Sequence, residues 1–337
     1  MEIKEQIDIV YLWVDGNDPA WRLKRQQALA QLSPSNLDAL ALYSNVEGRF
    51  RDNDELRYSL RALEHFFPEH GHIYIITDAQ VPHWLCPCDR ITIIDHQMLM
   101  LGTSLPTFDS GNIESYIHHI PGLSEQYFYF NDDVFFGAPV NVTDWFWSDG
   151  IYVAWSDEPP VSDEPLRQDA TALENACRLS NQWFISQAHD GELQSDAISK
   201  VASTYEHTFR TFAHSPRPML KSVLYELEAL AADLFGNVRS TVFRTWNDPT
   251  IVSDFVMRWA LATGRAKSRE YSHLYVSTGE SESPSQLDIL IKRFGAIDFF
   301  CVNDTTDDAD HHDPRLKQVR DALEKMLPSR SSFERIE

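Results

Sequence analysis

Short apolar runs alternate with amphipathic segments along the first 150 residues of the chain. The runs are rich in β-branched and aromatic residues, which is typical of buried strands. They lie at residues 7–14, 72–77, 91–95 and 127–130. Between them, leucines at helical spacing predict a helix over residues 53–67, and a shorter helix is expected over 113–120. This alternation predicts an α/β fold, in which a sheet carries helices on its faces.

The second half of the chain is richer in helical patterns. The predicted helices cover residues 166–187, 216–234, 249–263, 285–293 and 314–326, and the predicted strands cover 151–155, 273–277 and 297–302. The polar stretch 156–169 holds two consecutive prolines and several acids, so we expect a loop or lid there. No internal repeat is evident in the sequence.

Four dipeptides join a capping residue to proline, the favoured first residue of a helix. They are Asp18-Pro19, Ser215-Pro216, Asp248-Pro249 and Asp313-Pro314. The last three follow polar clusters that contain histidine, arginine or asparagine. Helix N-termini bind phosphate, so these starts are candidate phosphate sites, although ordinary capping explains each one taken alone.

The chain of 337 residues carries 29 Lys+Arg against 51 Asp+Glu, a formal net charge of −22. This balance argues against a nucleic-acid-binding protein, which needs clustered positive charge, but allows an anionic substrate. With 43% hydrophobic residues the chain can build a large core.

We expect no signal peptide and no membrane-spanning helix, which predicts a cytoplasmic protein, with peripheral attachment at the inner face of the membrane left open. Four scattered cysteines, with Cys86 and Cys88 as the only close pair, indicate reduced thiols and neither a disulfide framework nor a zinc site.

The sharpest chemical feature is Asn131-Asp132-Asp133, which directly follows four aromatic residues. A buried strand that ends in two carboxylates places them at the carboxyl edge of the sheet, where open α/β folds bind ligands. Such a pair can hold Mg²⁺ or Mn²⁺ on a diphosphate, or one carboxylate can act as a base. A β-turn of ordinary composition is the alternative.

Two charged segments are further candidates. Residues 49–61 are dense in arginine, which binds phosphate in a bidentate way, although arginine–carboxylate pairs on a helix surface explain most such runs. Residues 304–313 gather five aspartates and two histidines after a predicted strand, a plausible cation-binding or catalytic loop. The loop lacks the glycine and final glutamate of an EF-hand, and the chain has no P-loop, nucleophile elbow or kinase motif.

These segments resemble the Stealth family in four blocks. The first block is IDIVYLWVDGNDPAW; the second holds RFRDNDELRYSLRALEHFFPEHGHIYIITDAQVPHWL and LPTFDSGNIESYIHHIPGLSEQYFYFNDDVFFG; the third holds AHSPRPML and FRTWND; the fourth is CVNDTTDD. Their order is that of the family, and they extend over nearly the whole chain. The resemblance implies one catalytic domain over residues 1–337, with a nucleotide-sugar-binding half related to the GT-A type (1–150) and a helix-rich half that completes the active site (151–337).

Stealth proteins are sugar-1-phosphate transferases, so the resemblance implies the transfer of a hexose-1-phosphate from a UDP-sugar to a glycan hydroxyl. UMP would be released, and UDP-GlcNAc or a similar compound would be the donor. The compact bacterial enzymes of capsule and exopolysaccharide synthesis resemble this chain most. The acceptor would be an oligosaccharide or polysaccharide, and the cofactor Mg²⁺ or Mn²⁺.

The resemblance also implies roles for individual residues. Asp132 and Asp133 match the family's paired acids as metal ligands or base, and Asn303 and Asp304 would complete the metal site with Asp133. His214 would be an acid or a base and Arg244 would neutralise charge. Which of Asp133 and His214 takes the proton stays open. The expected substrate contacts are Asp15, Gly16, Asn53, Arg57, His118, Asn131 and Asn247. A structural role for His118 is equally plausible.

Two alternatives are a metal-dependent GT-A glycosyltransferase, which moves the sugar alone, and a non-catalytic interaction protein. The motif blocks also contain several arginines, and these are Arg49, Arg51, Arg57, Arg61, Arg217 and Arg244. We therefore expect an acidic exterior with local arginines that face a diphosphate.

Overall fold

A five-stranded sheet forms the centre of the computed structural model, which describes residues 6–42, 44–189, 196–310 and 312–336. The strand order is β3-β2-β1-β4-β8. The strands are β1 (Asp8–Leu12), β2 (Ile73–Thr77), β3 (Ile91–Asp95), β4 (Gln126–Asn131) and β8 (Arg217–Leu220). The first four are parallel, and β8 runs antiparallel to β4 at the edge. The four strands predicted in the first half of the chain are confirmed, and so is the α/β class.

Two smaller sheets extend this centre. One has the order β10-β11-β5 and the other the order β6-β7-β9. Their strands are β5 (Val134–Phe136), β6 (Phe146–Trp147), β7 (Gly150–Val153), β9 (Ala266–Ser268), β10 (His273–Ser277) and β11 (Phe299–Asn303). Since β5 follows β4 after a two-residue turn and pairs with β11, the end of the chain lies beside the central sheet. The predictions of β7, β10 and β11 are confirmed, and their observed ends differ from the predicted ends by no more than two residues.

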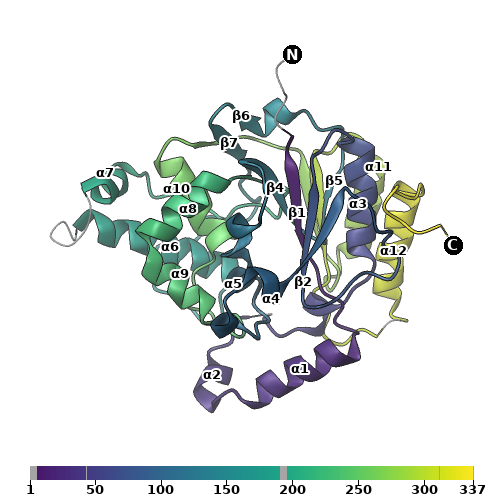
Figure 1. The fold of residues 1–337 in the computed structure, drawn as a ribbon, viewed down its shortest axis with the longest axis horizontal. Helices are drawn as coiled ribbons and strands as arrows, with labels where there is room; N and C mark the ends of the chain where they lie inside the picture. Colours follow the sequence, from purple (N-terminus) through teal and green to yellow (C-terminus); the bar gives the residue numbers. More distant parts are fainter. Residues whose placement is uncertain (1–5, 43, 190–195, 311, 337) are drawn as a thin grey trace.

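Helices flank the sheet on both sides (Figure 1). They are α1 (Pro19–Ala30), α2 (Pro34–Asp38), α3 (Glu55–Phe66), α4 (His96–Leu99), α5 (Ser110–Glu114), α6 (Ala172–His189), α7 (Asp196–Thr204), α8 (Lys221–Leu230), α9 (Ala232–Arg239), α10 (Val256–Ala262), α11 (Ser283–Arg293) and α12 (Pro314–Met326). In Figure 1, α3, α11 and α12 lie on one side of the sheet, and α6, α8, α9 and α10 lie on the other. Within the described residues, every helix is too short or too polar to span a lipid bilayer.

The capping prediction holds at two of its four sites. The Asp18 carboxylate accepts the N–H groups of Ala20 and Trp21, and Asp313 accepts that of Arg315, so α1 and α12 begin as expected. Near Asp248 the helical region begins later, with a π-helical turn (Ile251–Phe255) that continues into α10. The Asp248 carboxylate instead accepts the N–H of Thr245.

The helix predicted over residues 216–234 is wrong at its start. The segment after Ser215 forms strand β8, and the helices α8 and α9 follow from Lys221. Pro218 lies opposite Phe128 in this ladder, a position that proline tolerates because β8 is an edge strand.

The other helix boundaries also shift. The predicted helix over 113–120 divides into α5 and a 3₁₀ turn (Ile117–His119), and the helix predicted from residue 166 begins at Ala172. The helix α3 begins after Asp54, whose φ of 68° is left-handed, so neither Asp52 nor Asn53 is its cap. Residues 156–169 form no helix or strand, as the loop prediction states.

The hydrophobic core is built around β4. The residues Tyr127–Phe130 are 0% exposed, and one continuous cluster of buried side chains runs from Ile7 to Phe333. The aromatic run therefore fixes the end of β4, and with it the position of the residues Asn131, Asp132 and Asp133.

Candidate active site

A cavity of about 210 Å³ lies where the central strands end. The residues Leu12, Ile76 and Asn131 line it from β1, β2 and β4, and Asn303 lines it from β11. Its other polar walls include Arg49, Arg51, Glu55, Glu114, Asp132, Asp133, His214, Arg217, Arg244 and Asp304. The cavity therefore occupies the carboxyl edge of the sheet, the usual ligand site of such folds.

Two adjacent carboxylates enter the cavity from the turn between β4 and β5. Burial raises the pKa of Asp133 to about 6. Burial, and then the charge of Asp133, raise the pKa of Asp132 well above its usual value. The Oδ2 atom of Asp133 accepts the S–H of Cys301 at 3.4 Å, while its Oδ1 atom is buried without a hydrogen-bond partner. A buried carboxylate oxygen that lacks a donor favours a cation in the cavity.

The imidazole of His214 is held neutral by its surroundings. Burial, and then the charges of Arg217, Arg244 and Arg49, lower its pKa to about 3. Its Nδ1 atom is buried without a partner, and its ring packs on that of Tyr275 with the centroids 5.0 Å apart. An anion that offsets the arginine charges would raise this pKa and make His214 a better proton acceptor.

Arg49, Arg217 and Arg244 give the cavity positive charge. Two of these arginines are bound at the start of α5, where Ser110 Oγ accepts hydrogen bonds from Arg49 at 3.1 Å and from Arg244 at 2.5 Å. Arg244 also pairs with Asp109 at 3.2 Å. Burial, and then Arg244, lower the pKa of Arg49 to about 10. Guanidinium groups in this arrangement suit the several oxygens of a phosphate.

The fourth motif block reaches the cavity through β11. The side-chain amide of Asn303 donates to the hydroxyl of Tyr275 at 2.8 Å, so its amide oxygen is the atom that could ligate a cation. The carboxylate of Asp304 binds Arg51, accepts the Asn53 amide at 3.2 Å and accepts the Thr306 hydroxyl at 2.7 Å. Asp304, which follows β11, therefore connects that strand to Arg51 and Asn53. His311, in the same acidic segment, lies outside the described residues.

Six predicted substrate contacts are not among the residues that line the cavity, although three of them adjoin a lining residue in the chain or form a hydrogen bond to one. Gly16 donates its N–H to the carbonyl of Phe50, a lining residue, at 2.7 Å, and Asn53 binds Asp304. Asp15 is fixed beside Gly16 by hydrogen bonds with the Gln80 side chain.

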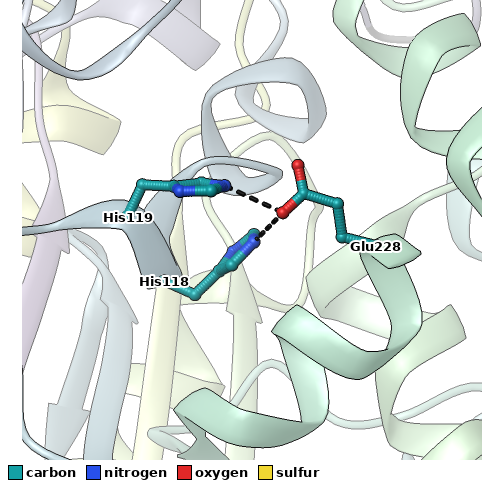
Figure 2. Close-up of side chains that lie close together, drawn as sticks. All are labelled: His118, His119 and Glu228. Carbon is teal, nitrogen blue, oxygen red and sulfur yellow. Dashed lines mark hydrogen bonds and ion pairs between the residues drawn. The ribbon is translucent and has the colours of Figure 1, made fainter.

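The other three are engaged elsewhere. Arg57 pairs with Glu334 at 2.6 Å, and Asn247 accepts the hydroxyl of Thr245 at 2.6 Å. Figure 2 shows that His118 and its neighbour His119 both bind one oxygen of Glu228, at 2.6 and 2.8 Å. The structure thus joins the 3₁₀ turn that contains His118 to α8, away from the cavity-lining residues.

The group His118, His119 and Glu228 could also hold a metal ion, because its ligand atoms lie within 4.8 Å of one another. Two imidazoles and one carboxylate suit Zn²⁺ better than Mg²⁺. Burial lowers the pKa of His118 to about 4. Burial alone would raise the pKa of Glu228, but hydrogen bonds from His118 and Arg239 lower it to about 2. The Glu228 carboxylate is paired by Arg239 as well as by the two imidazoles, while Nδ1 of His118 is buried without a hydrogen-bond partner.

Sequence reasoning missed Glu114 as a residue of the site. This fully buried glutamate at the end of α5 lines the cavity and accepts the hydroxyl of Tyr129 at 2.9 Å. Burial raises its pKa, while Arg217 and Arg244 oppose the rise. The signal in the sequence was a carboxylate among the apolar positions of residues 113–120, a segment interpreted there only as a short helix.

Three models of one family match the chain. Stealth protein CR1, conserved region 1, matches residues 5–33; CR2, conserved region 2, matches 49–154; and CR4, conserved region 4, matches 291–337. The chain belongs to the Stealth family. The matches include Arg49, Glu114, Asp132, Asp133, Asn303 and Asp304, whereas His214, Arg217 and Arg244 lie outside these ranges.

Relatives of this Stealth chain carry the name exopolysaccharide phosphotransferase. One from Streptomyces coelicolor is 33% identical over 100% of the chain and 53% of its own length. CpsY of Mycobacterium tuberculosis is 33% identical over 98% of the chain and 58% of its own length. The chain thus spans little more than half of the length of these relatives.

Solved structures with a similar outline are more distant. The galactosyltransferase LgtC, in complex with donor and acceptor sugar analogs, aligns with a TM-score of 0.41 and 8% identity, covering 97% of this Stealth chain and 98% of its own. An inositol-1-phosphate CTP transferase from T. maritima gives a TM-score of 0.38 and 12% identity over 97% and 98% of the two chains. Likeness at this level supports no assignment of activity.

Proposed function

We propose that this Stealth chain transfers a hexose-1-phosphate from a UDP-sugar, such as UDP-GlcNAc, to a hydroxyl of an oligosaccharide or polysaccharide, in capsule or exopolysaccharide synthesis. One observation carries the proposal: paired carboxylates, a neutral histidine and arginines without full pairing line one cavity. Phosphoryl transfer needs a positioned nucleophile and charge stabilisation, and these groups supply both. The names of the relatives point the same way.

The volume of the cavity suits the reacting part of the donor better than the whole donor molecule. At about 210 Å³ it is smaller than the usual pocket for a complete organic ligand, so we assign it to the diphosphate of the donor. The uridine and the acceptor would then lie toward the cavity mouth.

In the proposed step, the acceptor oxygen forms a bond to the phosphorus that bears the sugar. The bond from this phosphorus to the bridging oxygen breaks, and UMP leaves with that oxygen. The hydroxyl proton passes to Nδ1 of His214, whose pKa rises as the diphosphate offsets the nearby arginines. Arg244, held by Asp109 and Ser110, stabilises the charge on the phosphoryl oxygens.

The residues present fit a divalent cation. Asp133, with its unpartnered Oδ1, and the amide oxygen of Asn303 would hold Mg²⁺ or Mn²⁺, with Asp132 beside them. The carboxylate of Asp304, expected as a further ligand, is instead engaged by Arg51, Asn53 and Thr306. Such an ion would neutralise phosphate charge. EDTA should then abolish turnover and Mg²⁺ or Mn²⁺ should restore it, and full activity in EDTA would remove the cation from the proposal.

Product analysis tests the reaction itself. The protein is incubated with a panel of UDP-sugars and glycan acceptors, and the nucleotide released is identified by chromatography. UMP together with a phosphodiester in the ³¹P NMR spectrum of the product supports the proposal. UDP with a plain glycoside would instead support a metal-dependent glycosyltransferase, and neither product would favour an interaction protein.

A further inference from the structure

Arg217 differs from the other buried arginines of the described chain in its lack of partners. Five arginines are less than 9% exposed: Arg25, Arg61, Arg178, Arg217 and Arg258. The other four donate hydrogen bonds to side chains at 2.6–3.2 Å. Arg217 is 2% exposed, and its Nε and Nη1 atoms are buried without any hydrogen-bond partner.

The sheet fixes the position of Arg217 at the cavity. Arg217 is the first residue of β8 and lies opposite Tyr129 in β4, two residues before Asn131, which ends that strand. Its guanidinium lies 5.9 Å from the centre of the Tyr129 ring, and the residue lines the cavity. The ladder fixes the backbone of Arg217 beside the cavity, and the side chain is buried there.

The acids around Arg217 act only at longer range. Its charge opposes the rise that burial causes in the pKa of Glu114 and of Asp133, but within the described residues no carboxylate oxygen is paired with it inside 4.0 Å. Arg244 and Arg49 lie near the same imidazole, because the charges of all three arginines lower the pKa of His214. A buried guanidinium with unused donors beside two like charges is unfavourable unless an anion completes the site.

We propose that Arg217 is an anion-binding residue whose guanidinium donates to the non-bridging oxygens of a phosphate in the cavity, together with Arg49. The inference rests on the proposed function only for the identity of the natural anion, a nucleoside diphosphate sugar. Without an anion, the Nε and Nη1 atoms of Arg217 have no hydrogen-bond acceptor in the folded protein. A bound phosphate would supply the acceptors.

The first test measures binding without turnover. Isothermal titration with inorganic pyrophosphate, in phosphate-free buffer with and without Mg²⁺, compares the wild type with Arg217→Met and Arg217→Lys. Hydrogen bonds to a charged group predict a dissociation constant about 10- to 100-fold higher for Arg217→Met. Arg217→Lys keeps the charge and loses the planar fork, so it should recover part of the affinity.

The second test measures thermal unfolding without the anion. A structural arginine stabilises the fold, as expected of Arg258, which is 0% exposed and pairs with Asp254 at 2.8 Å. Arg258→Met is therefore the matched control, and its Tm should fall well below that of the wild type. Arg217→Met should have a Tm at least equal to that of the wild type, because it removes a charge without a partner.

The outcomes separate the possibilities. Weaker pyrophosphate binding with an unreduced Tm supports the proposal. A Tm that falls as in Arg258→Met, pyrophosphate affinity equal to that of the wild type, or a wild type that binds no pyrophosphate would each overturn it. A protein that releases no UMP from any UDP-sugar but shows weaker binding in Arg217→Met would retain the anion site and refute the phosphotransferase instead.

Discussion

Two of the buried polar atoms without hydrogen-bond partners belong to residues with candidate chemistry at the cavity. Oδ1 of Asp133 and Nδ1 of His214 are such atoms, and both residues line the cavity. Groups of this kind are unfavourable in the free protein, so a substrate or ion that satisfies them explains their presence.

We expect Asp133→Asn and His214→Ala to lower kcat by about 10²- to 10⁴-fold, the usual contribution of an acid or base group. Asp149→Asn is the matched control, since Asp149 is exposed and its carboxylate accepts only the nearby Ser148 hydroxyl among the described contacts. Steady-state UMP release measures all three variants. A loss below about tenfold in both site variants would contradict the assignment.

At this scale the sequence placed some site residues better than others. Asn131, Asp132 and Asp133 were located by the aromatic run before them, because a buried strand must end at the sheet edge. Arg57 belonged to a charged helix, and only the fold shows that Glu334, 277 positions away in the sequence, is its partner. Glu114 was hidden for the converse reason, since nothing local in the sequence indicates that a glutamate will be buried beside Arg217 and Arg244.

Among the elements, β8 shows where local patterns fail. Ser215-Pro216 has the form of a helix start, and the helix that follows is real, but residues 217–220 of the expected helix form a strand with β4. The pairing is long-range and the strand is short, so tertiary contacts outweigh the local capping signal. Strands β10 and β11, longer and apolar, were predictable because their pattern alone distinguishes them.

Strand β10 also positions two site residues through Tyr275. Its ring packs on His214 and its hydroxyl accepts the amide of Asn303. Tyr275→Phe keeps the ring and removes the hydrogen bond, so we expect the Mg²⁺ concentration for half-maximal activity to rise about 10-fold or more. Tyr271→Phe, which removes a hydroxyl bonded to the carbonyl of Asp144 outside the cavity, is the control. An unchanged Mg²⁺ requirement in Tyr275→Phe would show that Asn303 is not held for a cation.

The segment after α12 is joined to α3 by buried ion pairs. Glu334, with a side chain 1% exposed, binds Arg57 at 2.6 Å and Arg61 at 2.7 Å. Burial alone would raise its pKa, but the hydrogen bonds of Arg61, Ser331 and Arg57 lower it from 4.5 to about 2. The stabilisation is therefore complete above about pH 4.5 and is lost as the pH falls toward 2.

We expect Glu334→Gln to lower the free energy of unfolding by about 1–3 kcal/mol at pH 7. The difference from the wild type should shrink below pH 4.5, because the wild-type carboxylate then becomes protonated in the unfolded chain. Denaturant titrations from pH 7 to pH 3.5 measure it. Glu324→Gln is the control, since Glu324 binds the same Arg61 from a 54% exposed position and should change stability by less than about 1 kcal/mol. A difference that stays constant with pH would refute the account.

Over the whole molecule, the cavity draws on both halves of the sequence. Its polar walls extend from Arg49 to Asp304, so residues of both predicted halves, 1–150 and 151–337, line it. The chain as a whole has more acidic than basic residues, but four arginines line the cavity: Arg49, Arg51, Arg217 and Arg244. Arg51 is already paired with Asp304. Two opposite fields therefore act on an anionic ligand, a long-range repulsion and a short-range attraction.

The dependence of binding on ionic strength distinguishes the long-range repulsion from the short-range attraction. The Debye length falls from about 30 Å at 0.01 M salt to about 8 Å at 0.15 M, so added salt screens the net charge of −22 far more than contacts inside the cavity. We expect the association rate constant of UDP, measured by stopped-flow fluorescence at fixed Mg²⁺, to rise several-fold over this range. The dissociation rate constant should change little, because it depends on buried arginine contacts. Uridine, which is neutral, is the control and should associate equally fast at both salt concentrations. If the association rate constant of UDP instead falls with salt, the arginines of the cavity dominate the field even at long range, and the acidic exterior has no part in how the ligand approaches.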